Sequence, residues 1–174
     1  MSIKQIITVP DEILKKKSKL IEKVGINEKK LIGDLFETMY NSNGIGLAAV
    51  QVGILKRILV IDVSGKDEEK QPLSFINPVI KKLSKETTVY EEGCLSIPNT
   101  FLEIERPKIC EVEFIDIEGK IKNLKCDGIL STCLQHEINH LDGKLIIDHV
   151  SKLKRDLIIK KISKTKKNPD RIVV

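Results

Sequence analysis

The chain has 174 residues, of which 41% are hydrophobic and 32% charged, so it fits one globular domain and excludes a disordered or fibrous protein. Its four Phe, two Tyr and no Trp argue against a module that stacks bases or sugars on aromatic faces. It also lacks any run of about 18 apolar residues and any apolar segment typical of a secretory signal, so we expect neither a membrane partner nor export.

Two helices are predicted in the first quarter of the chain. A short one opens near Pro10, with Pro10 in its first turn and Asp11 and Glu12 at the favourable end of its dipole. A second runs from about Asn27 to Met39, because its apolar residues recur at helical spacing and Gly44 lies just beyond. Its apolar stripe consists of Leu31, Ile32, Leu35, Phe36 and Met39.

The middle of the chain is rich in strand patterns. Two β-branched runs, Arg57–Val63 and Phe75–Leu83, are separated by the polar loop Ser64–Lys70. Apolar and polar residues then alternate from Ile104 to Ile117, before a turn at Glu118–Gly119. These patterns predict strands that are joined by short connections.

Two further helices are expected after the strands. Asp127 can cap one that ends at Gly143, and Ser151 can cap a second, basic one over about 151–167. The inward positions of the second are predicted to be Leu153, Leu157, Ile158 and Ile162. Since strands precede helices instead of alternating with them, we expect one α+β domain over residues 1–174, with a mainly antiparallel sheet around a central helix.

The basic charge is concentrated in this last segment. Residues 151–174 hold nine Lys or Arg and two Asp, so the segment carries +7 whereas the whole chain carries +5. Only four of the 30 basic residues are Arg, which disfavours sequence-specific recognition of nucleic acid. The segment could attract a polyanion without sequence preference, or could simply be the solvated face of a terminal helix.

The sharpest chemical signal is the run His136-Glu137-Ile138-Asn139-His140 in the first of these two helices. Two His four residues apart on a helix face the same point, where they can hold a divalent metal, and the intervening Glu can reach an activated water. The alternative is two His that pack in an ordinary core. That helix side is otherwise apolar, with Ile129 and Cys133, so both imidazoles need a partner and a metal supplies one.

A catalytic metal also needs a third protein ligand, and the common downstream choices are missing. In the arrangement H-E-x-x-H-x-x-G-x-x-H the third ligand is the last His, but Ile146 stands at that position here. A downstream Glu ligand is also missing, because no Glu follows Glu137. Asp142, Asp148 and His149 remain open as downstream candidates.

The upstream alternative is one of the four cysteines, which form no C-x-x-C pair and indicate a reducing compartment, such as the cytoplasm. Cys133 lies about 10 Å along the helix axis from His140, too far for a shared ion, so it is expected to line the site. Cys110 and Cys126 fall in alternating strand patterns and are expected to pack in the core. Cys94 differs, because Gly93 permits a close backbone approach and Pro98 is expected to end the strand.

Three segments together resemble the peptide deformylase family: GIGLAAVQVG at 44–53, EGCLSIP at 92–98 and QHEINHLDG at 135–143. Each motif is modest alone, but three in this order over about 100 residues are highly specific. The resemblance covers nearly the whole chain. It implies an α+β metallohydrolase that removes the formyl group from the N-terminal formylmethionine of nascent bacterial or organellar proteins and releases formate.

Carried onto this chain, the resemblance implies roles for eight residues. The metal ligands would be Cys94, His136 and His140, and Glu137 the general acid and base. Gln51 and the backbone N–H of Leu95 would stabilise the oxyanion. The substrate would lie along Ile45 and Gly46. Cys133, which helix geometry assigns to the lining of the site, is expected to contact the substrate as well. The family usually uses Fe²⁺, although Zn²⁺, Ni²⁺ or Co²⁺ fit the same donors.

The chain departs from common members of the family at three positions. Phe101 stands where an Arg is frequent, which concerns the grip on the peptide beyond methionine. Val50 replaces a Pro and Asp142 an Asn, and neither is an expected ligand. Two other functions remain to be distinguished, a metallopeptidase that cuts internal bonds and a ribosome-binding module with a structural metal. The expected partners are nascent formylmethionyl chains and, through the basic helix, the ribosome.

Overall fold

The structure, a computed structural model, describes residues 2–65 and 68–167. Its three α-helices are α1 (Ile26–Asn41), α2 (Gly128–Leu141) and α3 (Lys152–Lys167). Its strands are β1 (Gly46–Ala48), β2 (Ile58–Ile61), β3 (Leu73–Leu83), β4 (Thr87–Cys94), β5 (Ile97–Pro107), β6 (Cys110–Ile115) and β7 (Ile121–Cys126). Short 3-10 helices η1 (Glu12–Lys15), η2 (Ala49–Val52) and η3 (Ile146–His149) complete the described chain.

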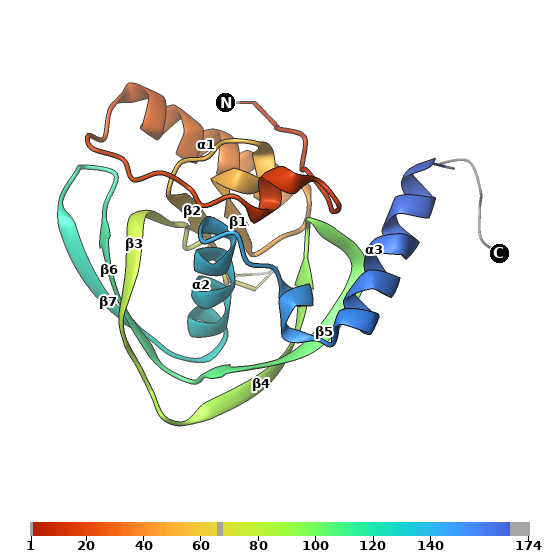
Figure 1. The fold of residues 1–174 in the computed structure, drawn as a ribbon. Helices are drawn as coiled ribbons and strands as arrows, with labels where there is room; N and C mark the ends of the chain where they lie inside the picture. Colours follow the sequence, from red (N-terminus) through yellow and green to blue (C-terminus); the bar gives the residue numbers. More distant parts are fainter. Residues whose placement is uncertain (1, 66–67, 168–174) are drawn as a thin grey trace.

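The strands form two sheets around α2. One has five strands in the order β1-β2-β3-β6-β7, and the other is the β4–β5 hairpin. All these neighbours pair antiparallel. Figure 1 shows α2 in the middle of the molecule, enclosed by the strands, with α1 above. The predicted α+β fold with a mainly antiparallel sheet around a central helix is therefore confirmed.

Strand β2 is buried along its whole length because a helix covers each of its faces. Leu59 and Ile61 belong to the apolar cluster that includes residues of α2. Ile58 and Val60 belong to the cluster that includes residues of α1. Side chains alternate across a strand, so the four-residue run ILVI supplies two residues to each cluster. This packing fixes α2 against β1 and β2.

The long alternating pattern at Ile104–Ile117 is divided between the two sheets. The chain leaves β5 at Pro107 and enters β6 at Cys110. The connection from β3, which ends at Leu83, to β4, which begins at Thr87, makes a similar bend between the two sheets. The Ser84 N–H donates to the Ile109 carbonyl oxygen at 2.9 Å across the two bends. The prediction of one strand was wrong here because alternation continues through a bend that moves the chain from one sheet to the other.

Two smaller predictions also need correction. Pro98 does not end a strand but lies at the start of β5, while β4 has already ended at Cys94. Pro10 and Asp11 precede the first helix instead of lying within it, and Asp11 caps it by accepting a hydrogen bond from the Ile13 N–H at 3.0 Å.

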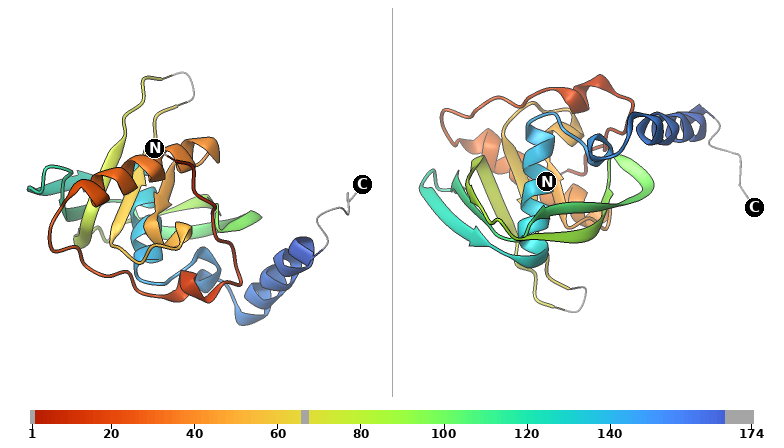
Figure 2. Two further views of the ribbon diagram at one scale, coloured as in Figure 1. Left: turned by 90° about the horizontal axis from the view of Figure 1, so that it is seen from above. Right: turned by 60° about the horizontal axis from the view of Figure 1, so that its bottom comes forward.

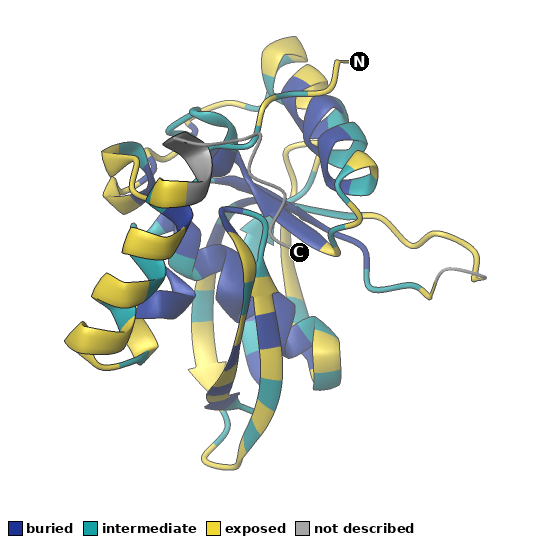
Figure 3. Ribbon diagram, turned by 90° about the vertical axis from the view of Figure 1, so that its right-hand side faces the viewer, coloured by how far each residue is buried: buried dark blue, intermediate teal, exposed yellow. Residues whose placement is uncertain are grey.

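Helix α3 follows the prediction only in part. Lys154 donates its backbone N–H to Ser151 Oγ at 3.3 Å, which confirms Ser151 as the cap, and Ile162 is buried. Leu153 and Leu157 are 73% and 59% exposed, so their predicted inward position was wrong. The helix extends away from the body in Figure 2, and its outer side is exposed in Figure 3. Only a narrow apolar stripe therefore meets the core.

The end of the basic segment, residues 168–174, lies outside the described residues. Within the described part of the chain, no helix is both long and apolar enough to cross a membrane.

Candidate active site

Three ligand-type side chains from distant parts of the sequence converge beside α2. Cys94 Sγ lies 3.2 Å from His140 Nε2, which lies 3.2 Å from His136 Nε2. All three atoms are within 4.8 Å of one another. Both imidazoles are buried, and Cys94 is half-buried. This spacing matches three ligands around one ion.

Local structure explains why these side chains meet. His136 and His140 lie one turn apart on the same face of α2. Cys94 is the last residue of β4, and the β4–β5 register shifts between Gly93 and Cys94. Such an irregularity can redirect a side chain, here placing the thiol at the two imidazoles.

The three downstream alternatives are not brought to this group. Asp142 Oδ1 instead accepts a hydrogen bond from Arg57 Nη1 at 2.6 Å. Asp148 accepts one from the Leu145 N–H at 2.8 Å, and His149 is exposed. Among the described residues, the group of three whose ligand-type atoms converge consists of Cys94, His136 and His140.

The hydrogen bonds of the imidazoles fit a metal site. His136 Nδ1 is 2.8 Å from Glu92 Oε2, so this nitrogen donates and Nε2 is left as a ligand atom. Burial lowers the pKa of His140 well below its ordinary value and keeps this ring neutral. Burial also lowers the pKa of His136, but contacts with Cys94 and Glu92 outweigh it and raise the pKa to about 10. A divalent cation at this point would replace the proton of His136.

A buried charge network supports His136 from behind. Arg106 binds Glu92 with two hydrogen bonds, from Nε at 2.5 Å and from Nη2 at 2.9 Å. Its Nη1 donates to Asn139 Oδ1 at 2.8 Å, next to His140 in sequence. Burial raises the pKa of Glu92, yet the bonds from Arg106 and His136 outweigh it and hold the pKa below its ordinary value. Arg106 was not predicted from the sequence, because the residue pattern of a strand does not show that an Arg in it is buried.

Glu137 lies beside the ligand cluster and against β1. It is 4% exposed, and no described residue forms a hydrogen bond with its Oε2. Burial raises its pKa to about 7, which suits a group that both takes up and releases a proton near neutral pH. A Cβ at Gly46 would lie 2.5 Å from Glu137 Oε1, so the close approach requires glycine at this position.

The amide of Gln51 has one possible orientation. Its Oε1 accepts a hydrogen bond from the Ala48 N–H at 2.8 Å, and an N–H can only donate. Its Nε2 therefore points the other way, 3.2 Å from Ser96 Oγ and 3.9 Å from Cys94 Sγ. The structure thus directs an N–H donor toward the ligand cluster, and Leu95 follows Cys94 directly.

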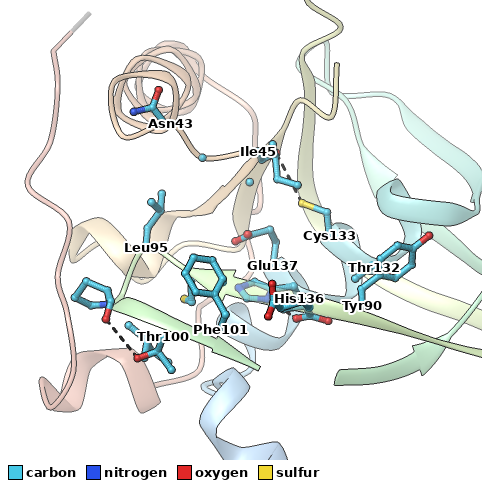
Figure 4. Close-up of a pocket in the computed structure, with 18 of the residues that line it drawn as sticks. Asn43, Ile45, Tyr90, Leu95, Thr100, Phe101, Thr132, Cys133, His136 and Glu137 are labelled. Carbon is cyan, nitrogen blue, oxygen red and sulfur yellow. Dashed lines mark hydrogen bonds and ion pairs between the residues drawn. The ribbon is translucent and has the colours of Figure 1, made fainter. Parts of the chain in front are cut away.

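A cavity of about 500 Å³ opens onto this group. Its lining includes Gly46 and residues of the β4–β5 hairpin. In Figure 4, Ile45 and Cys133 lie on one side of Glu137 and Phe101 of β5 lies on the other. The Ile45 carbonyl oxygen accepts a hydrogen bond from the Asp62 N–H at 2.9 Å and a weak one from Cys133 Sγ at 3.7 Å. Burial raises the pKa of the Cys133 thiol well above its ordinary value, so it lines the cavity in neutral form.

Comparison with known proteins gives one consistent family. The model of the polypeptide deformylase family matches residues 3–156. The chain is 53% identical over 174 residues to the peptide deformylase of Pelagibacter ubique, with 100% of both chains covered. It is 52% identical to that of Agrobacterium fabrum, over 94% of this chain and 96% of the relative.

Solved structures agree with these sequence matches. The crystal structure of peptide deformylase from Ehrlichia chaffeensis superposes with a TM-score of 0.92 at 42% identity, covering 97% of this chain and 99% of that one. The structure of the Ehrlichia chaffeensis enzyme in complex with actinonin gives a TM-score of 0.91 at 43% identity and covers 99% and 100%.

Proposed function

Because this chain belongs to the peptide deformylase family, we propose that Cys94, His136 and His140 form the metal centre at which it deformylates nascent proteins. The enzyme hydrolyses the amide between the formyl group and the N-terminal methionine and releases formate. The observation that carries the assignment of residues is the convergence of one sulfur and two imidazole nitrogens within 4.8 Å.

The donor set fits a divalent metal ion, and we propose Fe²⁺ as the physiological one. Zn²⁺, Ni²⁺ or Co²⁺ suit the same sulfur and nitrogen ligands and can replace it. When bound, such a cation supplies a Lewis acid that polarises the formyl carbonyl and activates water.

Glu137 is the group that moves the proton. Its carboxylate takes a proton from the attacking water as the water oxygen bonds to the formyl carbon. It then gives this proton to the methionine nitrogen as the carbon–nitrogen bond breaks, which yields formate and a free amine. The raised pKa of Glu137, about 7, suits both the uptake of the proton from water and its release to the methionine nitrogen.

The negative charge that develops on the formyl oxygen needs hydrogen-bond donors. We assign these to Gln51 Nε2, whose orientation is fixed through Ala48, and to the Leu95 N–H. One such donor typically lowers the barrier by about 3–4 kcal/mol.

The peptide is proposed to bind along the edge of the five-stranded sheet. Strand β1 is the end strand of that sheet, so the segment around Ile45 and Gly46 offers one edge for pairing with an extended chain. Cys133 contributes to the wall beside Glu137.

We also propose the domain organisation, the cellular compartment and a partner of the protein. The three apolar clusters together with α3 are assigned to a single catalytic domain over residues 1–174. Four free cysteines fit a reducing compartment, which we take to be the bacterial cytoplasm. The exposed Lys residues of α3 are proposed to contact the ribosome, whose RNA is a polyanion.

A substitution of Glu137 tests the assignment of residues. The Glu137→Ala variant should lose formate release from formyl-methionyl peptides while its metal content equals that of the unchanged protein. Glu103→Ala, at an exposed position on β5, serves as the control and should retain activity. Substantial turnover by Glu137→Ala would refute its role, and new internal peptide ends in place of formate would indicate a metallopeptidase.

A further inference from the structure

Two cysteines that deformylation does not use face each other across a pair of strands. Cys110 begins β6 and Cys126 ends β7, and the two residues are directly opposite in the antiparallel register. Directly opposite residues point to the same face of a sheet. Both belong to the apolar cluster that includes residues of α2, at 0% and 2% exposure. The pairing of β6 with β7 therefore holds two thiols side by side in the core.

The backbone spacing of this pair suits a disulfide bond. Directly opposite Cα atoms of antiparallel strands are about 4.5–5.5 Å apart. Disulfide bonds usually join residues whose Cα atoms are about 4.4–6.8 Å apart. An S–S bond between Cys110 and Cys126 is therefore compatible with the existing strand pairing.

The two thiols differ in their readiness to react. Hydrogen bonds from Cys126 and Ser131 outweigh burial and lower the pKa of Cys110 to about 7. The same contact with Cys110, together with burial, raises the pKa of Cys126. The thiolate is the form of cysteine that attacks an oxidant. Cys110 is thus the nucleophile of the pair, and Cys126 is the thiol that follows it.

The other two cysteines have different partners. Cys94 Sγ lies 3.2 Å from His140 Nε2 in the candidate metal centre, and Cys94 packs against another apolar cluster. Cys133 Sγ donates to the Ile45 carbonyl oxygen at 3.7 Å on the cavity wall. The thiol that contacts Cys110 is that of Cys126.

The pair lies at an end of the five-stranded sheet. Strand β7 is the last strand of that sheet and pairs, within the described part of the chain, with β6 alone. Its residues before Cys126 are exposed or half-buried. Segments with few buried contacts open locally at a lower free energy than the whole protein unfolds. Such opening exposes both sulfurs to a molecule as small as hydrogen peroxide.

We propose that Cys110 and Cys126 form a dithiol site that hydrogen peroxide oxidises to a reversible disulfide. The Cys110 thiolate attacks a peroxide oxygen, the O–O bond breaks, and a sulfenic acid and a hydroxide ion result. The hydroxide takes up the proton that Cys110 released and becomes water. The Cys126 sulfur then attacks the Cys110 sulfur, the S–O bond breaks, and the Cys126 proton leaves with the departing oxygen as a second water.

The two thiols thus give two electrons to one peroxide. In a reducing compartment, disulfides are transient. Two molecules of a small thiol reopen this one by exchange and become a disulfide themselves. The site is independent of the deformylation proposed above, because neither cysteine belongs to the candidate metal centre.

Peroxide treatment of the zinc-loaded protein, followed by blocking of free thiols and digestion with trypsin, provides the test. The peptide 109–120, which contains Cys110, should be joined to the peptide 126–144, which contains Cys126 and Cys133. The joined pair should weigh less than the two separate peptides by two hydrogen atoms. Dithiothreitol should separate it again.

Cys133→Ser is the matched control and should leave the joined peptides in place. Cys126→Ala should abolish the link and leave added oxygen on Cys110. Absence of joined peptides at every peroxide concentration at which the unchanged protein stays folded would overturn the proposal. A link that persists in Cys126→Ala and is lost in Cys133→Ser would overturn it as well. Formate release is not part of this readout, so a failure of the proposed function is distinguished from a failure of the dithiol site.

Discussion

Arg106 shows how one residue can organise a metal centre that it does not touch. It is 5% exposed and joins Glu92, which holds His136, to Asn139, which precedes His140. It therefore connects β5, β4 and α2 through charge-assisted hydrogen bonds, the strong class of such bonds in proteins. We assign it as a positioning residue for both ligand imidazoles.

Arg106→Met should remove this support. Glu92 would lose its two charge-assisted hydrogen bonds from Arg106 and keep only His136 as a partner, which should cost up to about 3–5 kcal/mol of stability. The affinity for Zn²⁺ should also fall by about 10- to 100-fold, since the partner of His136 Nδ1 loses its anchor. Denaturant unfolding of the metal-free protein and competition with a chelator measure the two effects.

Arg155→Met is the control, because Arg155 makes an exposed ion pair with Asp148 on the surface. It should change neither quantity by a measurable amount. Unchanged Zn²⁺ affinity in a folded Arg106→Met protein would contradict the positioning role.

Individual residues also show what sequence alone can supply. His136 and His140 were predicted as a pair because helical spacing is a local property. The structure brings Cys94 to them and leaves Asp142, Asp148 and His149 elsewhere, a choice that local spacing could not make. The motifs of the resemblance pointed to Cys94, but the partnership of Arg106 with Glu92 depends on the pairing of β4 and β5.

At the scale of elements, Asp62 joins α1 to the end of β2. Its Oδ2 accepts a hydrogen bond from Tyr40 Oη at 2.6 Å, and its Oδ1 accepts one from Ser64 Oγ at 2.6 Å. Burial raises the pKa of Asp62, but these hydrogen bonds outweigh it and hold the pKa below its ordinary value of 3.8. The ionised form of Asp62 therefore stabilises the folded state.

Asp62→Asn should destabilise the protein by about 1–3 kcal/mol at neutral pH, because hydrogen bonds to a charged group are lost. A carboxyl group with a lowered folded-state pKa adds stability above its unfolded pKa, and this is lost as the pH falls through the folded value. The difference between the two proteins should thus shrink below about pH 4. Denaturant unfolding at several pH values measures it, and a difference that stays constant down to pH 2 would contradict it.

The elements were predicted best where their patterns are purely local. The apolar stripe of α1 is visible in sequence as a helical period, because one face of the helix is buried. The strand β2 is visible as a continuous apolar run, because both of its faces are buried. The division of Ile104–Ile117 into β5 and β6 was missed, since the alternation is the same in both sheets. The exposure of Leu153 and Leu157 was missed because an amphipathic pattern does not reveal how much of its apolar side is covered.

At the scale of the whole molecule, α3 combines two roles. Ile158 and Ile162 pack in the cluster beneath β5, so the helix belongs to the core of this region. Its other faces carry exposed Lys residues, and the outer side of the helix is coloured as exposed in Figure 3. Removal of the segment after Val150 would therefore alter packing and charge together.

A charge variant separates these roles. Replacement of Lys152, Lys154, Lys160 and Lys164 by Gln removes four exposed charges and keeps the buried isoleucines. Co-sedimentation with ribosomes at low salt should fall markedly relative to the unchanged protein, because phosphate contacts dominate such binding. Formate release from a free peptide should persist as the folding control. Equal co-sedimentation of the two proteins would contradict the ribosome proposal.

The most direct test of the whole account is X-ray absorption at the metal edge of the zinc-loaded protein. The geometry of Cys94, His136 and His140 predicts one sulfur neighbour at about 2.3 Å and two imidazole nitrogens at about 2.0–2.1 Å. The sulfur signal should vanish in Cys94→Ser and persist in Cys133→Ser. A shell of nitrogen and oxygen alone in the unchanged protein, or a sulfur signal that survives Cys94→Ser, would contradict the account.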